Sequence, residues 1–180
     1  MTLWRLEWLR LVRTRRLPAL AGVFVFFGLV GPLTARFLPE ILDRFGGGIE
    51  VVVPDPAPAD GIIQFSSNAI QIGLLVAVVV AAGARALEGI PELAVFLRTR
   101  VPSAARLLAP RVITVTAAVV AAYLLGVGVA WYETAVLLGA VPAGGLLLGA
   151  LLGVLYLAFA VAVVAVAGSR TGSVLATVLV

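Results

Sequence analysis

Four polar residues lie at helical spacing inside an apolar segment, and they are the side chains best suited to contact a solute. They are Gln64, Ser67, Asn68 and Gln71. Separations of three, four and seven residues from the first put all four on one face of a helix. Because amide groups are costly to expose to lipid, this polar stripe should face protein or water. Two interpretations stay open, hydrogen bonding between helices and the lining of a translocation path.

Two side chains that many enzymes use for catalysis are missing. The 180 residues include no cysteine and no histidine, which excludes thiolate chemistry, imidazole catalysis, disulfides and most transition-metal sites. No segment matches the G-x-x-x-x-G-K-[ST] pattern, so the chain cannot bind nucleotide through a P-loop. We therefore expect no catalytic residue, no metal site and no cofactor.

Glycines form a second pattern, nearer the end of the chain. Gly145, Gly149 and Gly153 recur at every fourth position. Small residues at this spacing let the backbone of another helix approach closely. The pattern predicts helix packing, either within one chain or between two subunits.

Composition indicates that these residues lie on membrane helices. Of all residues 62% are hydrophobic and 12% charged, and the mean hydropathy is +1.16, whereas about a quarter of a soluble domain is charged. Since a helix needs about 20 apolar residues to cross the hydrocarbon layer, four spans are predicted, at 17–35, 61–84, 112–132 and 142–167. A fifth apolar run at 171–180 is too short to span. The predicted fold is an all-α, polytopic transmembrane helix bundle, with its fifth helix cut short.

The distribution of arginines along the chain predicts the orientation of this bundle in the membrane. Apart from Arg36 and Arg44, every basic residue lies before the first span, between the second and third, or after the fourth. The positive-inside rule assigns those segments to the cytoplasm. We expect a cytoplasmic N-terminus, a mostly irregular outer loop at 36–60 and a cytoplasmic connector at 85–111. All basic residues are arginine, which is typical of GC-rich genomes and favours a bacterial plasma membrane.

The leader at 1–16 has the pattern of an interfacial amphipathic helix. One face of its helical wheel carries Trp4, Trp8, Leu11 and Val12, and the opposite face carries Glu7, Arg10, Arg13 and Thr14. Tryptophan prefers the headgroup layer and arginine meets anionic lipid there, so the leader is predicted to lie along the inner leaflet. An ordinary basic flank of the first span is the alternative. The first apolar run is longer than that of a signal peptide, which favours a retained span.

A short helix is expected inside the cytoplasmic connector. Pro91 suits a first helical turn, and Glu92 complements the positive end of the helix. An apolar face and two basic residues follow, namely Leu93, Phe96, Leu97, Arg98 and Arg100. An amphipathic helix too short to cross a membrane packs against something, here either the membrane surface or a cytoplasmic protein.

The connector contains a further pattern, from Glu88-Gly89-Ile90-Pro91-Glu92-Leu93 through Phe96-Leu97-Arg98-Thr99-Arg100-Val101-Pro102-Ser103 to Arg106-Leu107-Leu108 and Arg111. It resembles the cytoplasmic segment of type-2, export-class permeases of ATP-binding-cassette (ABC) transporters. That family has an acid–Gly–Thr–x–Glu run, then Thr/Ser-Arg-Pro-Val-Ser, then a basic residue opening the next span. Here Ile90-Pro91 replaces the threonine-containing pair, and Val101-Pro102 reverses the Pro-Val order. The order of elements also resembles that of the family: a surface helix comes first, then the first span, a large outer loop and the connector.

The resemblance implies a permease subunit that pairs with itself or a sister permease and with two cytoplasmic ABC ATPase chains. Its connector would be the coupling helix, with Glu88, Glu92, Leu93, Phe96, Leu97, Arg98 and Arg100 as the ATPase-coupling residues. ATP hydrolysis on the partner would move the spans, without covalent chemistry in this chain. Membrane lipid is the other expected partner, and nucleic acid is not. Family members have six spans, which fits a fifth span that stops at Val180.

Other classes of function are weaker or stay open. An intramembrane enzyme or an ion-coupled carrier needs ionisable groups at depth, and the predicted spans contain no Asp, Glu, Arg or Lys. A membrane anchor or assembly subunit is the stronger alternative, because the sequence does not show that anything moves.

Overall fold

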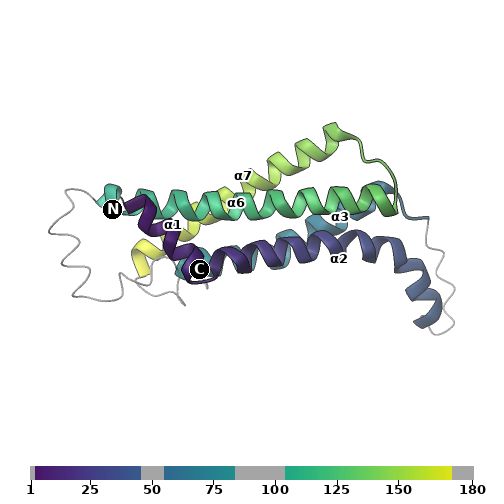
Figure 1. The fold of residues 1–180 in the computed structure, drawn as a ribbon, viewed down its shortest axis with the longest axis horizontal. Helices are drawn as coiled ribbons and strands as arrows, with labels where there is room; N and C mark the ends of the chain where they lie inside the picture. The colour runs from purple at the N-terminus through teal and green to yellow at the C-terminus, as the bar shows by residue number, and fades with distance from the viewer. Residues whose placement is uncertain (1–2, 46–54, 84–103, 172–180) are drawn as a thin grey trace.

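The computed structural model describes residues 3–45, 55–83 and 104–171. These ranges contain five helices and no strand (Figure 1). They are α1 (Leu3–Arg13), α2 (Arg16–Phe45), a helix made of α3 (Pro58–Asn68), the π-helical turn η1 (Ala69–Gly73) and α4 (Leu74–Gly83), then α6 (Ala104–Leu137) and α7 (Ala143–Thr171).

Four of these helices are long and apolar enough to cross a membrane. The qualifying segments are Arg16–Leu42, Pro58–Gly83, Leu108–Leu137 and Ala143–Ala167. They indicate a multi-pass membrane protein, and the predicted all-α bundle with four span-length helices is confirmed. The partial fifth span begins where α7 ends, and its other residues lie outside the described ranges, as does the predicted coupling helix.

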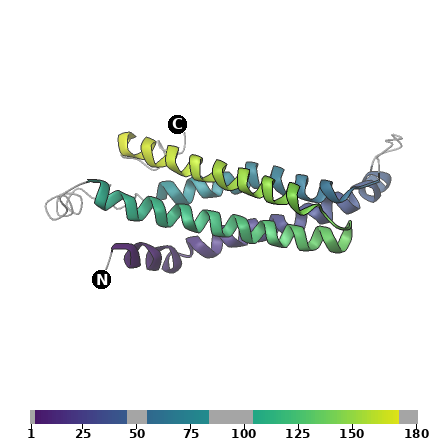
Figure 2. The ribbon, with the colours of Figure 1, turned by 90° about the horizontal axis from the view of Figure 1, so that it is seen from above.

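The long helices run side by side (Figures 1 and 2). The ends of α4 and α7 and the start of α6 lie at the end of the bundle where α1 packs, which we call the inner end. The opposite, outer end holds the end of α2, the start of α3 and the turn between α6 and α7. α7 packs on α4 and α6, on the side away from α1 (Figure 2).

The first span extends further than the hydropathy predicts. α2 continues to Phe45 through Pro32 and Pro39, so residues 36–45 of the predicted outer loop are helical. Arg36 ends the uncharged run without ending the helix, and its guanidinium lies over the ring of Phe37, 5.7 Å from the centroid. Hydropathy marks where the run of apolar side chains ends, whereas the backbone hydrogen bonds of the helix continue beyond that point.

Local sequence explains two helix boundaries at the outer end. Pro58 begins α3, and the carboxylate of Asp60 accepts a hydrogen bond of 2.8 Å from the N–H of Ala57, which satisfies a donor that the first turn would leave open. After α6, Gly139 adopts a φ of +107° and its N–H donates to the carbonyl of Thr134. Glycine takes this left-handed conformation at low cost, so the chain can turn into α7.

The core of the bundle is the close crossing of α2 and α6. A Cβ added at Gly126 would lie 2.7 Å from the carbonyl oxygen of Phe24, and one added at Gly28 would lie 2.8 Å from the carbonyl oxygen of Gly126. Only glycine fits such backbone contact. Phe24 is fully buried beside this crossing and meets the ring of Tyr123 edge-on at 5.8 Å.

Candidate functional sites: an inner-end cluster and a pocket between helices

A polar cluster at the inner end joins α1 to two other helices. The Nε of Arg111, in α6, donates to Oε1 of Glu7 at 2.9 Å. Arg10 lies 3.7 Å from the other carboxylate oxygen of Glu7, and its Nη2 donates to the carbonyl of Gly83 at 3.5 Å. Gly83 is the last residue of α4. One helix therefore contacts both flanks of the undescribed segment 84–103.

The cluster is largely shielded from solvent. The side chains of Arg111 and Glu7 are 6% and 13% exposed. Burial lowers the pKa of Arg10, and the negative charge of Glu7 partly opposes that shift while Arg16 and Arg111 add to it. An arginine keeps its charge throughout the physiological pH range, so Glu7 lies among permanent positive charges.

The arrangement of α1 differs from the simple division of its helical wheel. Trp4, Trp8 and Val12 are exposed, as suits a surface that faces lipid headgroups, whereas Leu11 is buried. The polar face does not point to solvent as a whole, because Glu7 and Arg10 turn toward the bundle. Arg111, expected as part of the connector, lies inside a continuous helix and is 5% exposed. The interfacial position of the leader stays a prediction.

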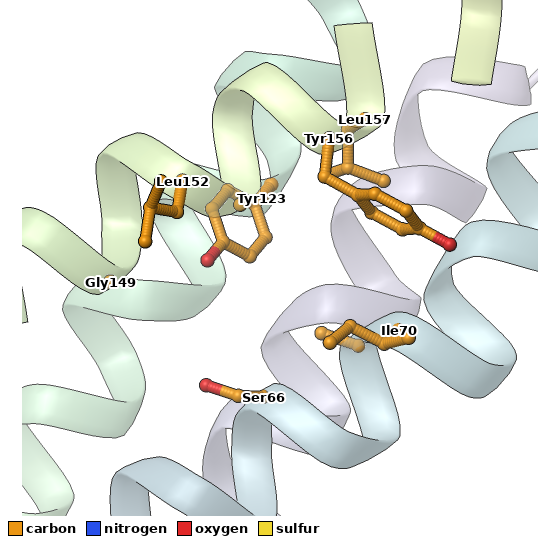
Figure 3. Close-up of a pocket in the computed structure, with 9 residues that line it drawn as sticks. Ser66, Ile70, Tyr123, Gly149, Leu152, Tyr156 and Leu157 are labelled. Atoms are coloured by element: carbon orange, nitrogen blue, oxygen red, sulfur yellow. The ribbon is translucent and has the colours of Figure 1, made fainter. Parts of the chain in front are cut away.

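A pocket of about 330 Å³ lies between the α3–η1 region, α6 and α7 (Figure 3). Its walls are mostly apolar, and three hydroxyl-bearing residues interrupt them. The lining residues are Ser66, Ala69, Ile70, Tyr123, Gly149, Leu152, Gly153, Tyr156 and Leu157. No pattern in the sequence indicates this site. The π-helical turn that contributes to its wall has no sequence signature that periodicity could detect.

The predicted translocation-path residues do not line this pocket. Gln64 and Asn68 are half-buried, whereas Ser67 and Gln71 are exposed. The neighbouring Ser66 lines the pocket instead. Within the described chain no side-chain hydrogen bond involves any of the four, so the structure leaves both interpretations of the polar stripe as predictions.

The three repeated glycines have unlike environments. At Gly153 an added Cβ would collide with the hydroxyl of Tyr123, whereas Gly145 and Gly149 have nothing within 4 Å of that position. Among the described residues, close packing therefore involves only the last of the three. The close backbone contact of Gly28 with Gly126 was missed, because these glycines do not recur at a regular interval along either helix.

Two polar residues near the outer end were not predicted to lie within a span. Glu133 and Thr134 fall inside the span-length part of α6, beyond the end of the predicted third span. Oε2 of Glu133 and Oγ1 of Thr134 are buried and accept or donate no hydrogen bond within the described residues. The hydroxyl of Thr134 packs against Gly61, where an added Cβ would lie 2.6 Å away.

The remaining predicted site residues cannot be placed. All seven proposed ATPase-coupling residues, from Glu88 to Arg100, lie outside the described residues. Among the residues that are described, no group of three or more acidic, cysteine or histidine side chains could hold a metal ion. No family model matches the chain, and neither a curated protein nor a solved structure matches it.

Proposed function

We propose that this chain is the transmembrane permease subunit of an ABC transporter of the export class. A separate cytoplasmic ATPase chain would supply the energy that moves a substrate across a bacterial plasma membrane. The observation that carries the proposal is the position of α1. Its contacts with Gly83 and with Arg111 join both flanks of the segment whose sequence resembles a coupling helix.

Such contacts let a force on the connector reach the spans. If an ATPase displaced residues 88–100, the inner ends of α4 and α6 would move. Because α1 contacts both helices, the two ends and α1 would move together. Packed helices respond to displacements of this kind by sliding or tilting as rigid bodies. The chain would thus change the access of a substrate path without performing chemistry itself.

The charge distribution supports a cytoplasmic inner end. The arginines of α1 and of the turn into α2 lie there, with Arg111, whereas Arg36, Glu40 and Asp60 lie toward the outer end. Arginine is retained on the cytoplasmic side of a membrane. We infer that the ATPase approaches from the side of α1.

The surface of α7 supports pairing with a second permease subunit. Leu148 is 60% exposed and Phe159 68%, and the open glycine Gly145 lies on the same face of the helix. An apolar surface with small residues packs well against another helix in a membrane. Lipid would cover whatever part of this surface the second subunit leaves.

Co-purification of the ATPase tests the proposal. The test uses a stand-alone ABC ATPase from a neighbouring reading frame of the same genome. Phe96→Ala should weaken its association about thirtyfold, because truncating a central aromatic anchor costs about 2 kcal/mol. Phe26→Ala is the matched control, since Phe26 is 56% exposed on α2, within the span-length segment Arg16–Leu42. Undiminished co-purification and coupled ATP hydrolysis in a well-expressed Phe96→Ala variant would contradict the proposal and favour a membrane anchor or assembly subunit.

A further inference from the structure

The pocket between α3–η1, α6 and α7 lies deep within the span-length helices. Tyr123 is near the middle of the segment Leu108–Leu137, and Tyr156 is near the middle of Ala143–Ala167. Ser66 lies closer to the outer end, in α3. The pocket is therefore at the depth of lipid chains rather than of headgroups.

Two departures from regular helix packing create this space. The π-helical turn Ala69–Gly73 interrupts the second span and contributes Ala69 and Ile70 to the wall. Opposite it, Gly149 has no side chain, and nothing lies within 4 Å of where its Cβ would be. π-Helical turns break the regular hydrogen-bond pattern of a helix and are frequent at functional sites.

The hydroxyl group of a mostly buried tyrosine points into the pocket. Tyr123 is 5% exposed, and its ring is held edge-on by Phe24 at 5.8 Å and stacked on Phe65 at 6.0 Å. Figure 3 shows its hydroxyl directed to the same side of the pocket as the hydroxyl of Ser66. No hydrogen bond joins the tyrosine hydroxyl to another described residue, so the hydroxyl can donate one to a molecule in the pocket.

The pocket opens toward the lipid. Ile70 is 53% exposed, Leu152 58% and Tyr156 44%, so three lining residues also form part of the outer surface of the bundle. A molecule dissolved in the membrane could enter between them without crossing water. None of the lining residues is ionisable at neutral pH, so nothing in the pocket would stabilise a charged ligand.

We propose that this pocket binds an uncharged, mostly apolar small molecule whose one carbonyl or ether oxygen accepts a hydrogen bond from Tyr123. A cavity of about 150 Å³ is enough to hold benzene, so a pocket about twice that size accepts a molecule with two rings. The remaining lining supplies apolar contact and Ser66 a second polar contact. This inference does not depend on the proposed ABC function, since none of the residues that line the pocket belongs to α1 or to the inner-end cluster.

Photolabelling with benzophenone tests this inference. Benzophenone has two apolar rings and one carbonyl oxygen, and near-ultraviolet light inserts it into nearby C–H bonds. The purified protein, reconstituted in lipid, is irradiated over a range of benzophenone concentrations, and the labelled peptides are mapped by mass spectrometry. Labelling should saturate and should concentrate on pocket residues such as Ile70, Gly149 and Leu152.

Three variants identify the site. Gly149→Leu should reduce saturable labelling about tenfold, because a leucine there fills the pocket. Gly144→Leu should leave labelling unchanged, since Gly144 is equally open on α7 and does not line the pocket. Tyr123→Phe keeps the ring stacking and removes the hydroxyl, so half-saturation should need roughly two- to tenfold more benzophenone.

Each alternative result would overturn the inference. Labelling that rises linearly with concentration and spreads over lipid-facing residues would show partitioning into lipid rather than binding. Equal labelling of Gly149→Leu and Gly144→Leu, both folded and with the oligomeric state of the native protein, would exclude the pocket as the site. An unchanged half-saturation in Tyr123→Phe would exclude the hydrogen bond.

Discussion

Glu7 and Arg111 are 104 residues apart in the chain, and their side chains meet at 2.9 Å. Arg10, one turn after Glu7, reaches the last carbonyl of α4. The leader helix is thus attached to the bundle through Glu7, Arg10 and the buried Leu11, while its tryptophans point outward. Any displacement of Gly83 relative to Arg111 must either carry α1 with it or break these contacts.

Loss of the carboxylate of Glu7 should destabilise the inner end. Glu7→Gln removes the negative charge between two arginines, and breaking a buried ion pair costs about 3 kcal/mol or more. We expect a lower melting temperature in detergent, measured by differential scanning fluorimetry. Arg5→Gln, an exposed position on the same helix, is the control.

A double-mutant cycle separates the pair from its surroundings. Glu7→Gln combined with Arg111→Gln should cost less than the sum of the two single changes, because each single change already removes the interaction. Strictly additive effects would mean that the ion pair contributes nothing to stability.

The crossing of α2 and α6 should not tolerate a single added methyl group. Gly126→Ala puts a Cβ 2.7 Å from the carbonyl oxygen of Phe24, and because backbone cannot yield easily, the variant should lose about 1–3 kcal/mol. Gly128→Ala is a matched control two residues along the same helix, since nothing lies within 4 Å of its Cβ position. Equal melting temperatures of the two variants would rule out the tight crossing.

The two interpretations of the polar stripe differ in water access. If it lines a path, Ser67→Cys and Gln71→Cys should react with a membrane-impermeant thiol reagent in reconstituted protein. Phe26→Cys on α2 and Leu125→Cys on α6, which replace apolar residues that are 56% and 52% exposed, should not react because they face lipid. The chain has no native cysteine, so the background is clean. Failure of all four to react would favour hydrogen bonding between helices.

Orientation can be tested in intact cells. Asp55 and Arg13 are exposed at opposite ends of the bundle. Asp55→Cys should be labelled by an impermeant maleimide without treatment, and Arg13→Cys only after the membrane is permeabilised. The reverse pattern would place α1 outside the cell and would remove the basis for an ATPase partner at that end.

The sequence was sufficient to predict the four span-length helices, because hydrophobicity and helix length are properties of contiguous residues. A stretch such as 142–167 must form a helix in lipid, where every backbone N–H and C=O needs a partner within the segment. It was less informative about helix ends. Residues 36–45 continue α2 beyond Arg36, since a helix does not end where its apolar side chains do.

Only the tertiary structure decided which faces meet. The helical wheel places Glu7 and Arg10 on the polar face of the leader. Only the folded chain shows that this face contacts Arg111 and Gly83, which are far away in sequence. In the same way Gly28 and Gly126 form the closest helix contact, whereas the regular repeat of Gly145 and Gly149 packs against nothing in the described chain. Periodicity within one helix identifies which residues share a face, but the partner of that face is set by how distant helices cross. The pocket at Tyr123 exists for that reason, since three separate helices must come together to enclose it.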